Sequence, residues 1–160
     1  VRKVHNINID STKVSKAKLS KIIGMDNYKK MIANIYIGDK LLEAPAVRGA
    51  KKTLGKLTKH HNIIIITNRT NDELETAKAW LKKKRIPYST ILNTSGTGKA
   101  IPCKAFNIDI LLDDNISELQ KVDSAQTRRI LLMRPFNKDM DKEHLYEHAQ
   151  DWNHFLKMLT

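Results

Sequence analysis

Apolar runs alternate with amphipathic segments along most of the chain. Short apolar runs, several of them rich in β-branched residues, predict strands at Val4–Ile9, His61–Thr67, Tyr88–Leu92, Ile108–Leu112 and Arg129–Met133. The second of these runs contains four consecutive isoleucines, Ile63–Ile66, bounded by polar residues, which is typical of a strand buried on both faces. Helical patterns lie between the strands, at about 46–60, 71–85, 98–106, 115–122 and 141–159.

This alternation indicates the fold class. Strands separated by crossover helices form a parallel sheet with helices on both faces. We therefore predict an α/β fold, a three-layer doubly wound parallel sheet, in which residues 1–160 form a single domain. The stretch 13–43 interrupts the alternation with one amphipathic helix, or two short ones around Gly24-Met25-Asp26. We interpret it as a small helical cap insertion after the first strand.

Charge and composition narrow the classes of partner. Lys and Arg number 29 against 17 Asp and Glu, and the net charge of +12 favours phosphorylated molecules, nucleotides or nucleic acid. Aromatic residues make up only 6%, and no predicted strand pairs them with Arg or Lys as a base-stacking platform would. No apolar run approaches the roughly 20 residues of a membrane helix, and the start VRKVHNINID resembles no secretory signal. We expect a cytoplasmic protein without a membrane partner.

Polar side chains follow the carboxyl ends of the predicted strands, where open parallel sheets bind their ligands. Carboxylates that hold Mg²⁺, together with hydroxyl and ammonium donors, are what phosphoryl chemistry requires. Groups of these kinds follow three predicted strands and begin one predicted helix: Asn8, Asp10 and Thr12; Thr67, Asn68 and Arg69; Asp113 and Asp114; and Lys99.

These clusters, in this order, resemble the four motifs of the haloacid-dehalogenase (HAD) superfamily. The family's first motif, D-x-D-G-T after a strand, is matched by NIDST at 8–12, and the second, a Thr closing an apolar strand, by IIIITNR with Thr67. The lysine of the third motif is matched by Lys99, and the acidic pair of the fourth by Asp113-Asp114. The segments EAPAVRGAKKTLGKL and LLMRPFNKD extend the resemblance, the latter to bacterial relatives of the 5'(3')-deoxyribonucleotidases.

The resemblance implies a Mg²⁺-dependent phosphate monoester hydrolase that acts through an aspartyl-phosphate on a small phosphorylated substrate such as a nucleotide. Asn8 would stand at the nucleophile position, with Asp10 as general acid and base. Thr67 and Lys99 would hold the phosphoryl group. The resemblance also implies that Thr12, Asn68 and Arg69 bind the substrate. The metal would be bound by Asn8, Asp10 and Asp113, with Asp114 as the second choice for the last of these.

The chain departs from the family pattern at the nucleophile. A carboxamide such as that of Asn8 can ligate Mg²⁺ and accept hydrogen bonds, but it is a poor nucleophile. The chain could be a nucleophile-dead form that still binds Mg²⁺ and phosphate. Alternatively the register shifts by two, so that Asp10 is the nucleophile and Thr12 replaces the acid/base, or Asp10 activates water directly. We prefer the unshifted alignment, because three motif positions then match with one near-isosteric change.

A catalytically silent module that binds nucleotide or nucleic acid is the alternative from another class. Asn8 and the net charge of +12 favour it, whereas the acidic pair opposes it, because clustered carboxylates repel phosphate unless a metal lies between them.

Several of the singled-out residues also have simpler structural explanations. Thr67 could cap the next helix, although Thr70 suits that role already, and Asn115 suits the helix after Asp113-Asp114. His144 and His148, spaced i, i+4 on one predicted helix, are expected to face solvent. The single cysteine, Cys103, is expected to be buried in packing.

Overall fold

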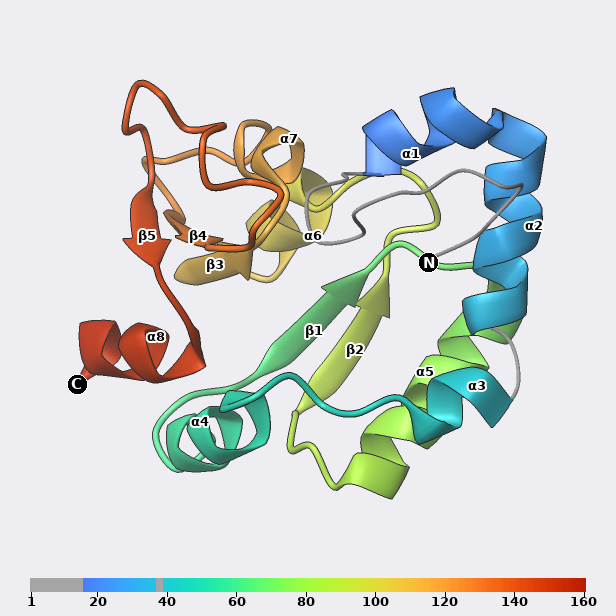
Figure 1. The fold of residues 1–160 in the computed structure, drawn as a ribbon. Helices are drawn as coiled ribbons and strands as arrows, with labels where there is room; N and C mark the ends of the chain where they lie inside the picture. Colours follow the sequence, from blue (N-terminus) through green and yellow to red (C-terminus); the bar gives the residue numbers. More distant parts are fainter. Residues whose placement is uncertain (1–15, 37–38) are drawn as a thin grey trace.

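A computed structural model describes residues 16–36 and 39–160 of the chain, and the predicted strand Val4–Ile9 lies outside these residues (Figure 1). The described elements, in chain order, are α1 (Lys16–Ile23), α2 (Met25–Tyr36), α3 (Asp39–Glu43), α4 (Ala50–Leu57), β1 (Ile64–Thr67), α5 (Asn71–Lys84), β2 (Thr90–Asn93), α6 (Ala100–Ala105), β3 (Ile110–Asp113), α7 (Ile116–Leu119), β4 (Arg128–Leu132), β5 (Glu147–Ala149) and α8 (Trp152–Leu159).

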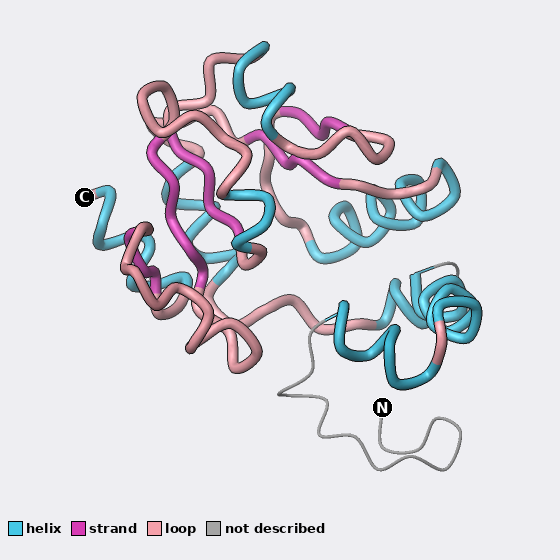
Figure 2. The backbone as a smooth tube through the Cα atoms, turned by 90° about the horizontal axis from the view of Figure 1, so that it is seen from above, coloured by secondary structure: helices cyan, strands magenta, loops and turns pink. Residues whose placement is uncertain are grey.

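All the described strands pair in parallel, in two groups. β1 pairs with β2, so that Thr67 lies opposite Asn93, and β4 lies between β3 and β5. Figure 2 shows the two groups of strands apart from each other, with helices around them. Within the described ranges, β1 and β3 are not hydrogen-bonded to each other. The prediction of an α/β fold with parallel strands and crossover helices is confirmed.

The core lies on both faces of β3 and β4, because alternate residues of a strand point to opposite sides. Leu111 and Leu131 join a cluster with Cys103 of α6 and Leu119 of α7. Ile130 and Leu132 of β4 point the other way, into a cluster formed with Leu57 of α4 and Phe155 of α8, and Ile110 and Leu112 of β3 pack against it. Two helical layers therefore enclose this part of the sheet, and the expected burial of Cys103 is confirmed at 1% exposure.

The burial of β1 differs from the expectation. Every residue of Ile64–Thr67 is half-buried, so the prediction of a strand buried on both faces is wrong. β2 is the one described strand that pairs with β1, so one edge of β1 has no described strand against it. Side chains from this segment do reach both core clusters, since Ile66 packs against the α6–α7 side and Ile63 against the α4–α8 side.

The segment expected as an insertion contains helices that break at a glycine. Gly24 separates α1 from α2 and has a φ of 80°, a conformation that glycine adopts without strain. α3 packs against α5, where Lys83 contacts Glu43 at 2.5 Å and the Trp80 indole donates a hydrogen bond to the Ala44 carbonyl. No helix among the described residues is long and apolar enough to cross a bilayer.

The predicted helix 141–159 is wrong in its first half. The segment before α8 folds around Asp141, whose carboxylate accepts hydrogen bonds from the backbone N–H groups of Leu145 and Tyr146 and contacts His148 Nε2 at 2.7 Å. β5 follows, and Asp151 then caps α8 by accepting from the His154 N–H. His144 therefore lies in a loop and His148 in a strand, and they do not share a helix.

Candidate active site

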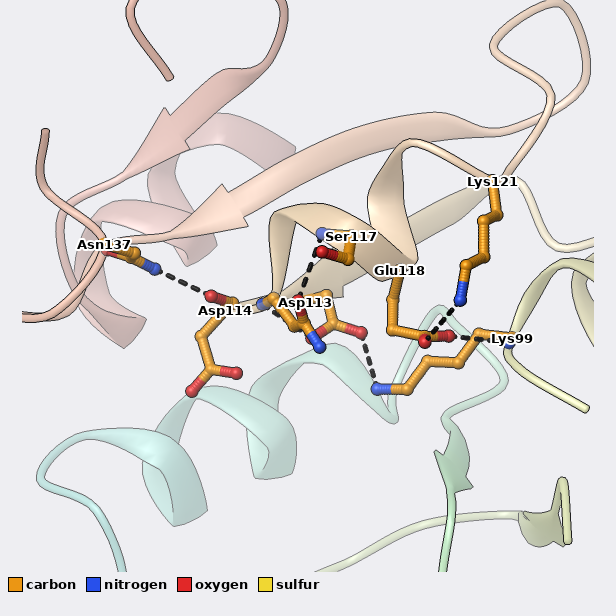
Figure 3. Close-up of polar contacts among 8 residues, drawn as sticks. Lys99, Asp113, Asp114, Ser117, Glu118, Lys121 and Asn137 are labelled. Carbon is orange, nitrogen blue, oxygen red and sulfur yellow. Dashed lines mark hydrogen bonds and ion pairs between the residues drawn. The ribbon is translucent and has the colours of Figure 1, made fainter. Parts of the chain in front are cut away.

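An ion pair between Lys99 and Asp113 forms the centre of the candidate site (Figure 3). Asp113 ends β3 with an exposure of 7%, and Lys99 precedes α6 as its N-cap residue. Lys99 Nζ lies 2.5 Å from Asp113 Oδ2, while Asp113 Oδ1 accepts a hydrogen bond from the Asn115 N–H. A buried carboxylate is costly without a cation and hydrogen-bond donors, and both are present here.

Glu118 of α7 fixes the backbone that carries Lys99. Its Oε2 accepts a hydrogen bond from the Lys99 N–H at 2.9 Å, and its Oε1 accepts from Lys121 Nζ at 3.2 Å. Partial burial acts to raise the pKa of Glu118, but these hydrogen bonds outweigh it and lower the pKa. Gly98, one residue before Lys99, has a φ of 82°, a left-handed conformation that glycine adopts without strain.

Asp114 points away from Lys99, as Figure 3 shows. Its carboxylate lies 3.8 Å from Arg134 Nε. Burial, and next the negative charge of Asp113, raise the pKa of Asp114. Its backbone carbonyl accepts a hydrogen bond from the side chain of Asn137, which is 1% exposed and also bonds the Leu132 carbonyl and the Arg134 N–H. Asn137 thereby joins the end of β3 to the loop after β4.

The ends of β1 and β2 are joined by a second asparagine. Asn93 Oδ1 accepts from the Arg69 N–H, and Asn93 Nδ2 donates to the Arg69 carbonyl. Thr67 lies beside them in half-buried β1, and its carbonyl accepts from the Thr94 N–H at 2.8 Å. Thr70 and Glu73 form a capping box on α5, and Asn115 caps α7, so both caps form as expected and Thr67 is not a cap.

Sequence reasoning missed Glu118 and Asn137. Glu118 carried a signal, because an acidic residue three positions after the cap residue Asn115 has the spacing of a capping box. The carboxylate instead accepts from Lys99, 19 residues earlier in the chain. Asn137 gave no signal, because its partners lie at two separate strand ends and only the folded chain brings them together.

The chain matches the family described as "5' nucleotidase, deoxy (Pyrimidine), cytosolic type C protein" over residues 3–160. The chain belongs to this nucleotidase family. It is also similar to a nucleotidase of Clostridium acetobutylicum, with 24% identity over 91 residues, which cover 57% of this chain and 47% of that protein. The chain thus spans about half the length of this curated relative.

Membership of the nucleotidase family gives the observed fold its name, a HAD-like α/β fold. The residues of the expected first motif, Asn8, Asp10 and Thr12, lie outside the described residues. Among those that are described, no group of three or more His, Cys, Asp or Glu side chains could hold a metal ion. Asp113 and Asp114 offer the oxygen ligands that Mg²⁺ prefers, but two carboxylates make only part of a coordination set.

Proposed function

We propose that this chain is a nucleotidase-type phosphate monoester hydrolase, with a nucleoside monophosphate as the class of substrate. The observation that carries the proposal is the ion pair of half-buried Lys99 with buried Asp113 at the carboxyl end of β3, in a chain of the nucleotidase family. An ammonium beside a carboxylate can bind a phosphoryl oxygen while the carboxylate binds a cation. Lys99 would contact the phosphate, as would Thr67 at the end of β1, and Asn68 and Arg69 follow Thr67 in the same loop.

The first motif supplies the remaining groups of the proposal. Asn8 takes the nucleophile position, Asp10 acts as general acid and base, and Thr12 binds substrate. Asn8, Asp10 and Asp113 would hold Mg²⁺, and Asp114 is the weaker candidate ligand because its carboxylate lies 3.8 Å from Arg134 Nε. The metal, when bound, would offset the negative charge of the phosphoryl group. We also propose that the protein acts in the cytoplasm.

We further propose that residues 1–160 act as one domain and that 13–43 is a short cap over the site. Two observations support the cap. The contacts of α3 with α5 anchor its end, through Lys83–Glu43 and Trp80. In Figure 1, α1 lies on the side toward which the arrowheads of β1 and β2 point.

Phosphate release tests the proposal and separates the three interpretations of Asn8. The protein, Asn8→Asp and the control Asn62→Asp would be assayed on nucleoside monophosphates with and without Mg²⁺. Asn62 is exposed ahead of β1, so the control adds the same charge elsewhere. Under the preferred alignment only Asn8→Asp turns over, by at least a hundredfold above the other two proteins.

Equal turnover by all three proteins would contradict the preferred alignment and favour Asp10, as a shifted nucleophile or as a base for water. Asp10→Asn should abolish turnover in both cases. Thr12→Ala separates them, because loss of Thr12 as the acid/base of the shifted register should lower kcat, whereas its loss as a substrate-binding residue should mainly raise KM.

A silent binding module remains the second candidate, favoured by Asn8 and by the net charge of +12. It predicts no turnover by any variant, together with an affinity for nucleic acid that needs no Mg²⁺ and falls steeply with salt. Filter binding at two salt concentrations measures that affinity directly.

A further inference from the structure

A cavity of about 880 Å³ lies between α4 and α8, away from the Lys99–Asp113 site. His60 and His61 line it, and they precede β1, whereas Thr67 at the other end of β1 belongs to the candidate site. The cavity is therefore at the amino end of β1, and the candidate site is at the carboxyl edge. Nothing in the proposed hydrolase reaction uses this cavity.

The two helices touch at their first turns and leave the cavity beside their later turns. Thr53 of α4 donates a hydrogen bond to the Trp152 carbonyl at 2.9 Å, and a Cβ on Gly49 would lie 3.2 Å from Trp152 Cβ. The cavity is lined mostly by residues from the later turns, with Leu57, Leu156 and Leu159 as its apolar wall, and Lys52 and Asn153 reach it from the first turns. Leu156 and Leu159 are half-buried, so apolar surface remains for a ligand to cover.

Basic side chains surround this apolar wall. Lys52, Lys56 and Lys59 come from one side, at helical spacing on α4 and just beyond it, and Lys157 comes from α8. All four are exposed, and none forms an ion pair with another described residue.

The carboxyl ends of α4 and α8 lie near the cavity, and their partial negative charges offset the lysine charges only in part. The carboxyl end of a helix carries about half a negative elementary charge, so α4 and α8 together contribute about one. Four lysines exceed this, and the cavity keeps a net positive potential. A potential of that sign in a concave site concentrates anions.

We propose that this cavity is a second binding site, which takes a free nucleoside polyphosphate. The ring system would cover the leucine wall while the phosphates pair with Lys56, Lys59 and Lys157. The volume lies within the range of about 300–1,000 Å³ that is usual for small-molecule sites, which favours a single nucleotide over a macromolecule. The proposal does not depend on the hydrolase reaction, because it shares no residue with the candidate active site.

Binding of ATP in EDTA tests the proposal on the whole chain. Calorimetry would compare ATP with adenosine, inorganic triphosphate and a short oligothymidylate, and amide chemical shifts would locate each probe. The double variant Lys56→Gln/Lys157→Gln removes two charges from the cavity. Its matched control, Lys82→Gln/Lys104→Gln, removes two charges from the last turns of α5 and α6, the same position that Lys56 and Lys157 hold in their helices.

We expect ATP to shift amides in 56–61 and 153–160 and to bind more tightly than adenosine or triphosphate alone. The cavity variant should lower the affinity for ATP by about tenfold and the control variant by less than twofold, because each exposed lysine–phosphate contact contributes only a small binding free energy. Equal losses in both variants would overturn the proposal in favour of a general charge effect. Shifts confined to 93–118 would overturn it in favour of the candidate active site, and tight binding of oligothymidylate alone would overturn it in favour of a nucleic-acid surface.

Discussion

The two groups of strands hold their loops in similar ways but at very different depths. In the β3–β4–β5 group, Ile130, Leu131 and Ala149 are fully buried, and Asn137 ties two strand ends together at 1% exposure. In the β1–β2 group no residue of β1 is buried, and Asn93 makes its bonds to Arg69 from a half-buried position. Asp113, the buried member of the Lys99–Asp113 pair, belongs to the β3–β4–β5 group, which we call the deep group. Thr67 ends β1 in the other group, which we call the shallow group, and Asn68 and Arg69 follow it, and none of the three is fully buried.

The largest expected effect comes from exchanging the two asparagines for alanine. Asn137→Ala leaves two carbonyls and one N–H without their partner in the core, and should lower the free energy of unfolding by about 3 kcal/mol. Asn93→Ala removes bonds that water can replace, and should cost about 1 kcal/mol. Urea denaturation of the two variants measures both values. Equal losses would show that the two groups of strands do not differ in the way burial indicates.

The charge of Lys99 stabilises the buried carboxylate of Asp113, and removing it gives a second test of the deep group. Lys99→Met leaves the Asp113 carboxylate buried without its cation, and should cost about 2 kcal/mol in urea denaturation, below the range for a fully buried pair because Lys99 keeps 21% exposure. The control Lys138→Met removes an exposed ammonium and should change stability by less than about 0.5 kcal/mol. Adding Asp113→Asn to Lys99→Met should recover part of the loss. A further loss in the double variant would contradict the uncompensated charge as the cause.

The same contrast explains what the sequence could predict. The predicted strands Ile108–Leu112 and Arg129–Met133 match β3 and β4 within two residues, because their apolar side chains join both core clusters. The run at His61–Thr67 had the same pattern, yet β1 is half-buried. Hydrophobic periodicity reports what a segment is able to bury, whereas the burial reached depends on which strands pair beside it.

Local caps could be predicted, and long-range hydrogen bonds could not. Thr70 and Asn115 cap helices within three residues of themselves, so their spacing is visible in the sequence. Asp141 binds Leu145, Tyr146 and His148 in a loop, whereas the spacing of apolar residues predicts that this segment belongs to the same helix as α8. A carboxylate that accepts hydrogen bonds from nearby backbone N–H groups competes with helix formation. The periodicity of apolar residues carries no information about that competition.

Asp141 gives a pH-dependent test within the deep group. Burial acts to raise the pKa of Asp141, but hydrogen bonds from His148 and from the N–H groups of Leu145 and Tyr146 outweigh it and lower the pKa below its usual 3.8. Folding therefore favours the ionised form, and this contribution is present above pH 3.8 and is lost as the pH falls through the lower value of the folded state. Asp141→Asn should cost about 1.5 kcal/mol at pH 7 in urea denaturation, and the difference should shrink below pH 3.8.

The exposed Asp139 of the same loop provides the control, since Asp139→Asn should leave stability unchanged at both pH values. A difference between Asp141→Asn and the parent protein that persists undiminished in acid would show that the contribution of Asp141 is packing and not charge.

Glu118 lies where the two groups of strands meet, because it belongs to α7 after β3 and accepts from the backbone of Lys99 in the loop after β2. Glu118→Ala removes that acceptor and should cost about 1 kcal/mol, whereas Glu118→Gln keeps an acceptor oxygen and should cost about half as much. The affinity for inorganic phosphate, measured by calorimetry, separates positioning from stability. If Glu118 orients Lys99, Glu118→Ala should weaken the binding of phosphate several-fold and Glu118→Gln should restore most of the affinity.

The control Gln120→Ala, exposed at the end of the same helix, should leave both the unfolding free energy and the phosphate affinity unchanged. Unchanged phosphate affinity in Glu118→Ala, at an unfolding free energy that is lowered as expected, would mean that Asp113 alone orients the lysine. The geometry of the site would then come entirely from the deep group.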